Sequence, residues 1–287
     1  MRFWFAVLGL AACRFGFDDE PGRDANARGG CDPAAPFATP VPIAELNDPT
    51  VDDGTLRLLP DELSGYFWSY RSGNSDIYLA TRPDLASPFT VSTVTGLDTL
   101  KNEVDPAVSA DGMLLVYRHN SPGDELWTAT RVGPAQFANP AVDSQLTSGA
   151  GDVQPFWQVG GQALYFSSQR SGGGDLYRST YSGTFSAPAL VSELSLATSE
   201  EGDPVIAPDG LTIYFRSNRP SGGPLMFNIW TASRTIASGA FGAPTLVANV
   251  NSDANEGPSW LSLDGCRLYL SSDRAGTNDI YVATRGH

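Results

Sequence analysis

The sequence predicts an all-β fold, a five-bladed β-propeller of four-stranded antiparallel blades, and three observations predict it. Its 287 residues include 30 Gly and 21 Pro, which interrupt the chain too often for long helices. A segment like Asp-Ile-Tyr-x-Ala-Thr-Arg returns about every 50 residues, a period typical of propeller blades. Its five copies start at Asp76, Glu125, Asp175, Asn228 and Asp279. The third observation is the segment Phe37–Leu46, which is similar to the last strand of a repeat but precedes the first repeat.

Each repeat contains four strand signals, and the third repeat serves as the example. Its first strand is expected near Gln154 to Val159 and its second at Ala163 to Ser168, with the turn Gly160-Gly161 between them. The third strand is expected at Asp175 to Thr180, after a glycine-rich hairpin. Other repeats place Asp-Gly at the first turn, where Gly accepts positive φ without steric penalty.

The fourth strand of each repeat begins with Phe. The expected segments are Phe89–Leu97, Phe137–Leu146, Phe185–Leu194 and Phe241–Val250. The last repeat stops at Arg285 after its third strand, whereas the segment Phe37–Leu46 precedes the first repeat. We therefore expect Phe37–Leu46 to complete the last blade, so that the ring closes without an unpaired strand edge.

The apolar positions of the second strands are expected to pack between blades, because no single blade can bury both of its faces. These positions are Tyr165, Phe166, Tyr214, Phe215, Tyr269 and Leu270.

The N-terminus predicts export and attachment to a membrane. Residues 1–12 combine a basic start with a short apolar run and are read as a signal peptide. Leu10-Ala11-Ala12-Cys13 resembles a bacterial lipobox, which would make Cys13 the acylated first residue of a lipoprotein in the periplasm or outer membrane. The alternative is an ordinary signal peptide with Cys13 discarded or idle. Residues 13–36 then form a flexible tether, and residues 37–287 form the propeller.

Two further cysteines predict a disulfide. Cys31 precedes the closing strand, and Cys266 follows the turn Asp264-Gly265 of the last blade. The topology puts both at the same end of one blade, and disulfides persist in exported proteins. We therefore expect a Cys31–Cys266 bond that secures the ring closure.

The net charge of −14 limits the partners that the chain can take. Such an acidic surface repels phosphate backbones, so nucleic acid is not an expected partner. It is compatible with a bound cation or with a basic protein partner.

An acidic residue stands eight positions before the first turn of every blade, and these five form the candidate binding ring. They are Asp53, Glu103, Asp152, Glu201 and Glu256. One interpretation is a carboxylate-ringed mouth that binds a cation such as Ca²⁺, or a basic group on a partner. The alternative is structural: each acid pairs with a hairpin arginine, namely Arg71, Arg170, Arg219 or Arg274.

Two details qualify this ring. Blade 2 is read as carrying Asn120 where the other blades carry Arg, which would leave Glu103 the least neutralised. The same arginines are also expected to pair with Asp76, Asp175 and Asp279 across their hairpins.

Signals of catalysis are weak, and no catalytic residue is predicted. His119 and His287 are the only histidines, and neither has a metal-ligand spacing or a neighbouring nucleophile motif. The blades look too uniform for an enzyme, because catalysis needs different residues from each blade. The sequence thus predicts a protein that is not an enzyme. The alternative is a glycoside-processing enzyme with paired acids from the ring, such as Glu103 and Glu201.

The repeat resembles the TolB-type, WD-repeat-like propeller repeat over residues 37–287. The resemblance is clearest at Pro204–Arg219 and Asn228–Arg234. It implies a cell-envelope propeller that works by binding other molecules. TolB-type domains commonly have six blades, whereas five are counted here, so a TolB role is not carried over. The expected function is a monomeric, lipid-anchored binding or scaffolding module for an envelope protein, a peptide or a glycan.

Overall fold

The computed structural model describes residues 30–286 apart from 98, 121–122, 161 and 222–225. The described residues from Cys31 onward form one compact unit. The predicted signal peptide, Cys13 and most of the tether lie outside the described residues and stay predictions. No helix in the described part of the chain is long and apolar enough to cross a bilayer.

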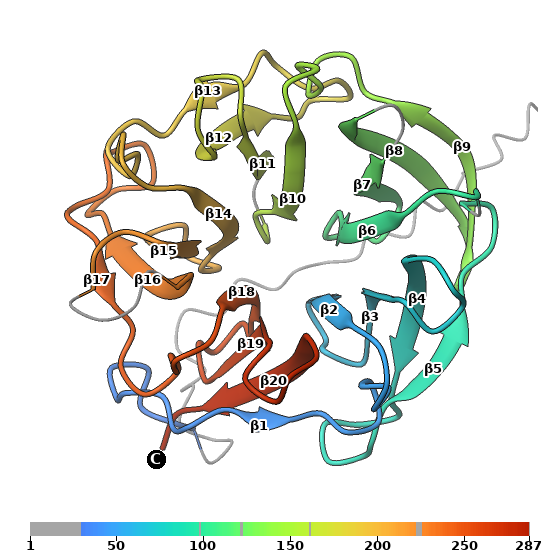
Figure 1. The fold of residues 1–287 in the computed structure, drawn as a ribbon, viewed down its shortest axis with the longest axis horizontal. Helices are drawn as coiled ribbons and strands as arrows, with labels where there is room; N and C mark the ends of the chain where they lie inside the picture. The colour runs from blue at the N-terminus through green and yellow to red at the C-terminus, as the bar shows by residue number, and fades with distance from the viewer. Residues whose placement is uncertain (1–29, 98, 121–122, 161, 222–225, 287) are drawn as a thin grey trace, which may run out of the picture. The chain divides into compact units, whose positions relative to one another are not determined.

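Five four-stranded antiparallel sheets stand around a common centre, which confirms the predicted propeller (Figure 1). In blades 1 to 4 the four strands follow one another along the chain from the centre of the ring outward. In blade 5 the three inner strands follow the same order, and the outermost strand comes from the N-terminal end of the propeller. Blade 1 contains β2 (Asp53–Leu58), β3 (Ser64–Ser69), β4 (Asp76–Thr81) and β5 (Thr90–Thr93). Blade 2 contains β6 (Glu103–Val108), β7 (Leu114–Asn120), β8 (Asp124–Gly133) and β9 (Gln136–Val142).

The remaining three blades repeat this order. Blade 3 contains β10 (Asp152–Trp157), β11 (Ala163–Ser168), β12 (Asp175–Thr180) and β13 (Ala189–Leu190). Blade 4 contains β14 (Glu201–Ile206), β15 (Thr212–Ser217), β16 (Asn228–Ser233) and β17 (Thr245–Leu246). Blade 5 contains β18 (Glu256–Leu261), β19 (Arg267–Ser272), β20 (Asp279–Thr284) and β1 (Val41–Pro42).

Strand exchange between the termini closes the ring, as the sequence predicts. β1 pairs with β20 through Val41 opposite Val282 and Pro42 opposite Tyr281, and Figure 1 shows the two strands side by side. The closing strand is much shorter than the expected Phe37–Leu46. Pro40 and Pro42 lack the backbone N–H that a longer ladder needs, and Pro188 and Pro244 directly precede β13 and β17.

The core lies between the blades, where aromatic second-strand residues pack. Tyr165, Phe166, Tyr214, Phe215, Tyr269 and Leu270 are all at most 5% exposed, as predicted. Their burial makes blade stacking the source of the core.

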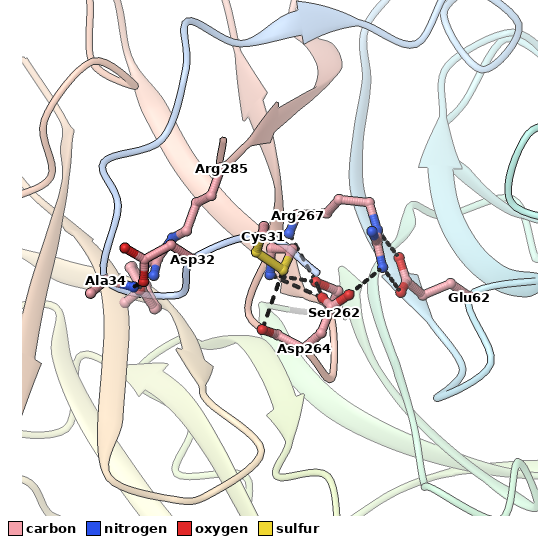
Figure 2. The surroundings of a disulfide bond; sticks show 10 residues. Cys31, Asp32, Ala34, Glu62, Ser262, Asp264, Arg267 and Arg285 are labelled. Carbon is pink, nitrogen blue, oxygen red and sulfur yellow. Dashed lines mark hydrogen bonds and ion pairs between the residues drawn. A yellow bond between two sulfur atoms is a disulfide. The ribbon is translucent and has the colours of Figure 1, made fainter. Parts of the chain in front are cut away.

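A disulfide between Cys31 and Cys266, with Cα atoms 5.9 Å apart, ties the start of the propeller to β19 of the last blade. Figure 2 shows that it lies beside Ser262 and Asp264. The Ser262 hydroxyl accepts hydrogen bonds from the backbone N–H groups of Cys266 and Arg267 at 3.0 and 2.8 Å. The bond thus adds a covalent link to the hydrogen bonds that hold this seam.

Every innermost strand carries a β-bulge. The strand register shifts between the second and the fifth residue of β2, β6, β10 and β14, and between the third and the fifth residue of β18. In four of the blades the third residue has a positive φ although it is not glycine: Thr55, Asp105, Gln154 and Asp203. Bulges of this kind re-aim side chains, and here they decide what faces the centre of the ring.

Candidate functional site

The five ring acids are buried and engaged within their own blades. Each is at most 1% exposed, and four of them pair with a hairpin arginine. The distances are 2.8 Å for Asp53–Arg71, 2.6 Å for Asp152–Arg170, 3.1 Å for Glu201–Arg219 and 3.2 Å for Glu256–Arg274. These four acids therefore pair with hairpin arginines, as the structural interpretation of the sequence predicts.

Each of these arginines joins three parts of its blade. Arg71, for example, donates to Asp53 on the innermost strand, to Ser69 at the end of β3, and to the Leu46 carbonyl in the loop that leads to β2. Its guanidinium also stacks over the rings of Phe67 and Tyr78 at 5.3 and 5.1 Å. The repeated acid therefore fixes blade geometry, and of the five only Glu256 lines a pocket at the centre.

Blade 2 replaces this arrangement with a histidine. Glu103 pairs in register with His119, as Asp53 does with Ser69, and the two side chains lie 3.5 Å apart. Asn120 therefore occupies the position of Tyr70, which corrects its predicted place at the Arg position. Burial lowers the pKa of His119. The imidazole is thus neutral near pH 7, and it stacks on Trp127 at 4.3 Å.

The predicted second pairing of the hairpin arginines is wrong. Asp76 accepts hydrogen bonds from Ser72 and from Asn74, the latter at 2.8 Å, and Asp175 accepts one from Ser171. The arginines are already directed toward the innermost strand, so short hydroxyl and amide side chains hold the hairpin carboxylates instead.

Among the described residues, no group of three or more His, Cys, Asp or Glu side chains is arranged to hold a metal ion. Four of the ring acids are instead paired with arginines of their own hairpins.

A pocket of about 200 Å³ lies at the centre of the ring, and all five blades line it. Most of its lining residues come from two positions of the repeat: the third residue of the innermost strand, and the residue 13 positions later on the second strand. In blades 1 to 5 the third residue is Thr55, Asp105, Gln154, Asp203 and Pro258. The second position contributes Trp68, Arg118, Arg216 and Ser271, and blade 5 adds Asn255, Glu256, Gly257 and Asn278.

Blades 2 and 4 each place an Asp–Arg pair in this pocket. Arg118 Nε lies 3.1 Å from Asp105 Oδ2, and Arg216 Nε lies 3.3 Å from Asp203 Oδ2. Asp105 also accepts a hydrogen bond from the Thr55 hydroxyl at 3.1 Å. The pocket therefore combines two carboxylates and two guanidinium groups, with Trp68, Gln154, Asn255 and Asn278 around them.

A third guanidinium, that of Arg57, interacts electrostatically with both pocket carboxylates. Arg57 is 2% exposed and donates to the backbone carbonyls of Ser259 and Pro155, the latter at 3.2 Å. Burial lowers its pKa to about 10, against the opposite effect of Asp203 and Asp105. Arg57 is therefore still protonated at neutral pH.

The two pocket carboxylates have unlike surroundings. Burial raises the pKa of Asp203, and the negative charge of Asp105 adds to this effect. The arginines 216, 57 and 118 oppose the rise without cancelling it. Asp105 instead has the Thr55 hydroxyl and Arg118 as direct partners. A raised pKa is what a carboxyl group needs to donate a proton closer to neutral pH, and Asp203 has it.

Sequence reasoning missed Asp105 and Asp203 as a pair. It sought what the blades share, whereas the pocket is lined by the positions where the blades differ. The signal was present two residues after each ring acid, where Thr, Asp, Gln, Asp and Pro follow one another within an otherwise regular repeat.

No protein-family model and no curated protein matches the chain. Several solved structures share its fold. The endo-arabinase of Bacteroides thetaiotaomicron is 16% identical with a TM-score of 0.58, and the match covers 88% of this chain and 97% of the enzyme. The catalytic domain of the Coprinopsis cinerea α-L-arabinofuranosidase is 12% identical with a TM-score of 0.55, over 88% of this chain and 98% of that domain.

The fold is also similar to that of TolB from Acinetobacter baumannii, with 15% identity and a TM-score of 0.50. That match covers 83% of this chain but only 56% of TolB, so the chain spans little more than half of that protein's length. At such identities the likeness shows the propeller fold, and it does not single out the TolB type.

The prediction that the protein is not an enzyme is corrected by these findings. Its argument was that a regular propeller lacks the blade-to-blade variation that catalysis needs. Single propeller domains of this length are the catalytic units of the two glycoside hydrolases, and the blades of this chain do differ where they line the central pocket.

Proposed function

We propose that the protein is a glycoside-processing enzyme that acts in the central pocket, with Asp203 as the proton donor and Asp105 as the second carboxylate. One observation carries the proposal: two carboxyl groups with unlike surroundings line the same pocket, and the pKa of one is raised by burial. Glycosidases generally need such a pair, one protonated and one ionised. The alternative acids Glu103 and Glu201 are buried in structural contacts and are not part of this proposal.

Other pocket residues suit a sugar. Asn255, Asn278, Gln154 and Ser271 supply amides and a hydroxyl that can bind sugar hydroxyl groups, and Trp68 supplies an aromatic surface. The volume of about 200 Å³ fits one sugar ring rather than a long segment of glycan. We therefore propose that one sugar unit enters the pocket while the rest of the substrate extends over the face of the propeller.

The test is a hydrolysis screen with the full chain, using arabinan, xylan, galactan, pectin and nitrophenyl glycosides. Arabinan is included because two proteins of similar fold carry arabinan-directed names. We expect release of reducing sugar from at least one substrate, with a loss of roughly 10²–10⁴-fold in kcat for Asp203→Asn and for Asp105→Asn. Asp84→Asn, in an exposed loop of blade 1, is the matched control and should retain full activity. Unchanged kcat in Asp203→Asn would refute the assignment.

A second candidate is a binding module that holds a glycan without cleaving it. It is favoured by the ion pairs of Asp105 with Arg118 and of Asp203 with Arg216, since paired carboxylates serve recognition as well as catalysis. The same panel separates the two functions. Binding by calorimetry with no product from any substrate over days would support the binding module.

A further inference from the structure

Neighbouring blades are joined by a tyrosine and an arginine that recur around the ring. Arg285, which follows β20, donates from Nη2 to the hydroxyl of Tyr214 in blade 4 at 2.9 Å, and its guanidinium stacks over the ring of Phe37 at 4.2 Å. The same contact joins Arg82 to Tyr269 at 3.3 Å and Arg234 to Tyr165 at 3.5 Å. These side chains fill the space between the outer parts of adjacent blades.

One junction departs from this pattern. Where blades 1 and 2 meet, Tyr66 and Arg131 are both present and donate to the carbonyl of Pro134, at 2.9 and 3.5 Å. Between blades 2 and 3 both residues are replaced: Val116 stands at the tyrosine position and Tyr181 at the arginine position. This junction therefore lacks the contact that fills the others.

A pocket of about 520 Å³ lies there, and we call it the junction pocket. It is lined by the turn between β6 and β7, by Trp157 at the end of β10, and by Gln162 and Tyr181 of blade 3. The central pocket is instead lined by the first three residues of β18 and by the third residue of the other innermost strands. The junction pocket is thus a separate site at the other end of these strands.

Its walls combine an aromatic surface with apolar side chains. The ring of Tyr181 packs edge-on against Trp157 at 5.4 Å and against Phe185 at 4.8 Å. Met113 and Leu114 of blade 2 line the pocket beside them, and Met113 is 50% exposed. Because its neighbours already hold the ring of Tyr181, little conformational freedom is lost when a ligand packs against it.

Half of the ten lining residues carry a hydroxyl, amide or carboxylate group. Within the described residues, the side chains of Thr130, Gln162 and Tyr181 make no hydrogen bond. Their hydroxyl and amide groups both donate and accept, as the hydroxyl groups of a sugar do. Asp111 is the one charged lining residue, and its Oδ1 already accepts two hydrogen bonds within its own turn. The pocket therefore matches a neutral, hydroxyl-rich ligand.

We propose that the junction pocket is a second carbohydrate site, which binds a segment of neutral glycan without cleaving it. The C–H faces of the sugar rings pack on Tyr181 and Met113, while their hydroxyl groups bind Thr130 and Gln162. Cleavage is not expected, because glycoside hydrolysis needs a pair of carboxyl groups and this pocket has only Asp111. The inference stands on the residues of this pocket and goes beyond the proposed function of the central one.

The experiment is affinity electrophoresis of the full chain in native gels that contain debranched arabinan, β-1,4-galactan or mixed-linkage β-glucan, all of them uncharged. We expect at least one polysaccharide to retard the protein. Titration calorimetry with the hexasaccharide of that polysaccharide then gives the affinity. The affinity should change by less than about twofold between 50 and 500 mM salt, because a neutral ligand has no charge to be screened.

Single variants assign the binding to the junction pocket. Gln162→Leu and Tyr181→Phe each remove one polar group and keep the packing, so each should weaken binding by about threefold or more, the loss expected for one hydrogen bond. Gln145→Leu, at an exposed glutamine in the loop between β9 and β10, is the matched control and should bind like the wild type. Trp68→Ala alters the central pocket only and should still be retarded.

A triple variant rebuilds the missing contact. Val116→Tyr/Trp157→Leu/Tyr181→Arg gives this junction the residue types of the junction between blades 5 and 1, namely those of Tyr269, Leu58 and Arg82. It should fold and lose the retardation, because the arginine then fills the pocket. Melting curves verify the folding of every variant, and if the triple variant is unfolded the two single variants decide.

Three results would overturn the inference: no retardation by any of the three polysaccharides, retardation that only Trp68→Ala removes, or an equal loss of binding in Gln145→Leu. Failure here is distinct from failure of the proposed function. Hydrolysis in the central pocket without this retardation removes only the second site. Retardation without hydrolysis of any substrate removes only the enzymatic activity.

Discussion

Asp279 is a hairpin carboxylate whose surroundings differ from those of its counterparts in other blades. It is 9% exposed, and its contact from the Thr277 hydroxyl is long, at 3.4 Å. Burial raises its pKa, and the negative charges of Asp53 and Asp52 add to the effect. Blade 4 has Asn228 at the matching position, opposite Ser217 as Asp279 lies opposite Ser272. The repeat therefore accommodates a neutral residue there.

We expect Asp279→Asn to stabilise the protein at neutral pH, by on the order of 0.5 kcal/mol because solvent screens part of the repulsion. With a raised folded pKa, the folded state binds the proton more tightly than the unfolded chain. The free energy of unfolding of the wild type therefore falls as the pH rises from 3.8 through the folded pKa of Asp279. The gain in the variant should vanish near pH 3.8 and below.

Denaturant unfolding between pH 3.5 and 7 measures this difference. Asp175→Asn is the control, because Asp175 accepts a hydrogen bond from Ser171 in its own hairpin and should gain nothing. A stabilisation of Asp279→Asn that is equally large at pH 3.5 and pH 7 would show that its cause is not the carboxylate charge.

Residue roles at the ring positions followed from the sequence only in part. The spacing of acids and arginines predicted that Asp53 and its equivalents either pair with hairpin arginines or form a binding ring, and only coordinates separate these outcomes. Asp105 and Asp203 were not predictable as a pair. Their direction depends on a bulge with positive φ, a conformation that neither Thr55 nor Gln154 favours by itself.

At the scale of elements, the seam between β1 and β20 is the place where the two ends of the propeller meet. Two residues pair in the ladder, supplemented by backbone hydrogen bonds such as Ala38 N–H to Thr284 O at 2.7 Å and Ile43 N–H to Ile280 O at 2.9 Å. The disulfide joins residues 235 positions apart, so in the unfolded chain it restricts nearly the whole propeller.

We expect Cys31→Ser/Cys266→Ser to lower the free energy of unfolding by about 3–5 kcal/mol, because the loop closed by the disulfide is long. Guanidinium titration of the variant and of the reduced wild type measures the loss. Cys13→Ser is the matched control and should unfold like the wild type. An unchanged midpoint in the double variant would mean that β1 alone secures the seam.

Strand lengths were less predictable than strand order. Second and third strands such as Ala163–Ser168 and Asp175–Thr180 match their predicted bounds, because alternating apolar residues run from turn to turn. The outer strands β13 and β17 have only two residues each. Pro188 and Pro244 lie in or beside them, and an outer strand with one neighbour has little to gain from further pairing.

At the scale of the whole molecule, repetition and variation have separate functions. The repeated acid, arginine and aromatic positions build blades that stack on one another, so the five-fold architecture could be predicted from the period alone. The central pocket is lined by the third residue of each innermost strand and, in four blades, by a residue of the second strand. A regular propeller can thus carry an irregular site, and regularity of the blades is no argument against catalysis.

Arg57 connects this site to the stability of the entire ring. It belongs to blade 1, donates to the carbonyls of Ser259 in blade 5 and Pro155 in blade 3, and stacks over Phe156 at 4.9 Å. Because the blades are arranged in a circle, these contacts join the innermost strands of three blades at the centre.

We expect Arg57→Met to lower the free energy of unfolding by about 3 kcal/mol or more. The substitution leaves two buried carbonyls without a donor and removes a positive charge near Asp203 and Asp105. Arg57→Lys keeps the charge with a single donor group and should lose less. Since the contacts span three blades, guanidinium unfolding should stay a single cooperative transition that shifts to lower denaturant. A variant that unfolds in two steps would show that Arg57 stabilises one blade, and an unshifted midpoint would show that the ring does not depend on it.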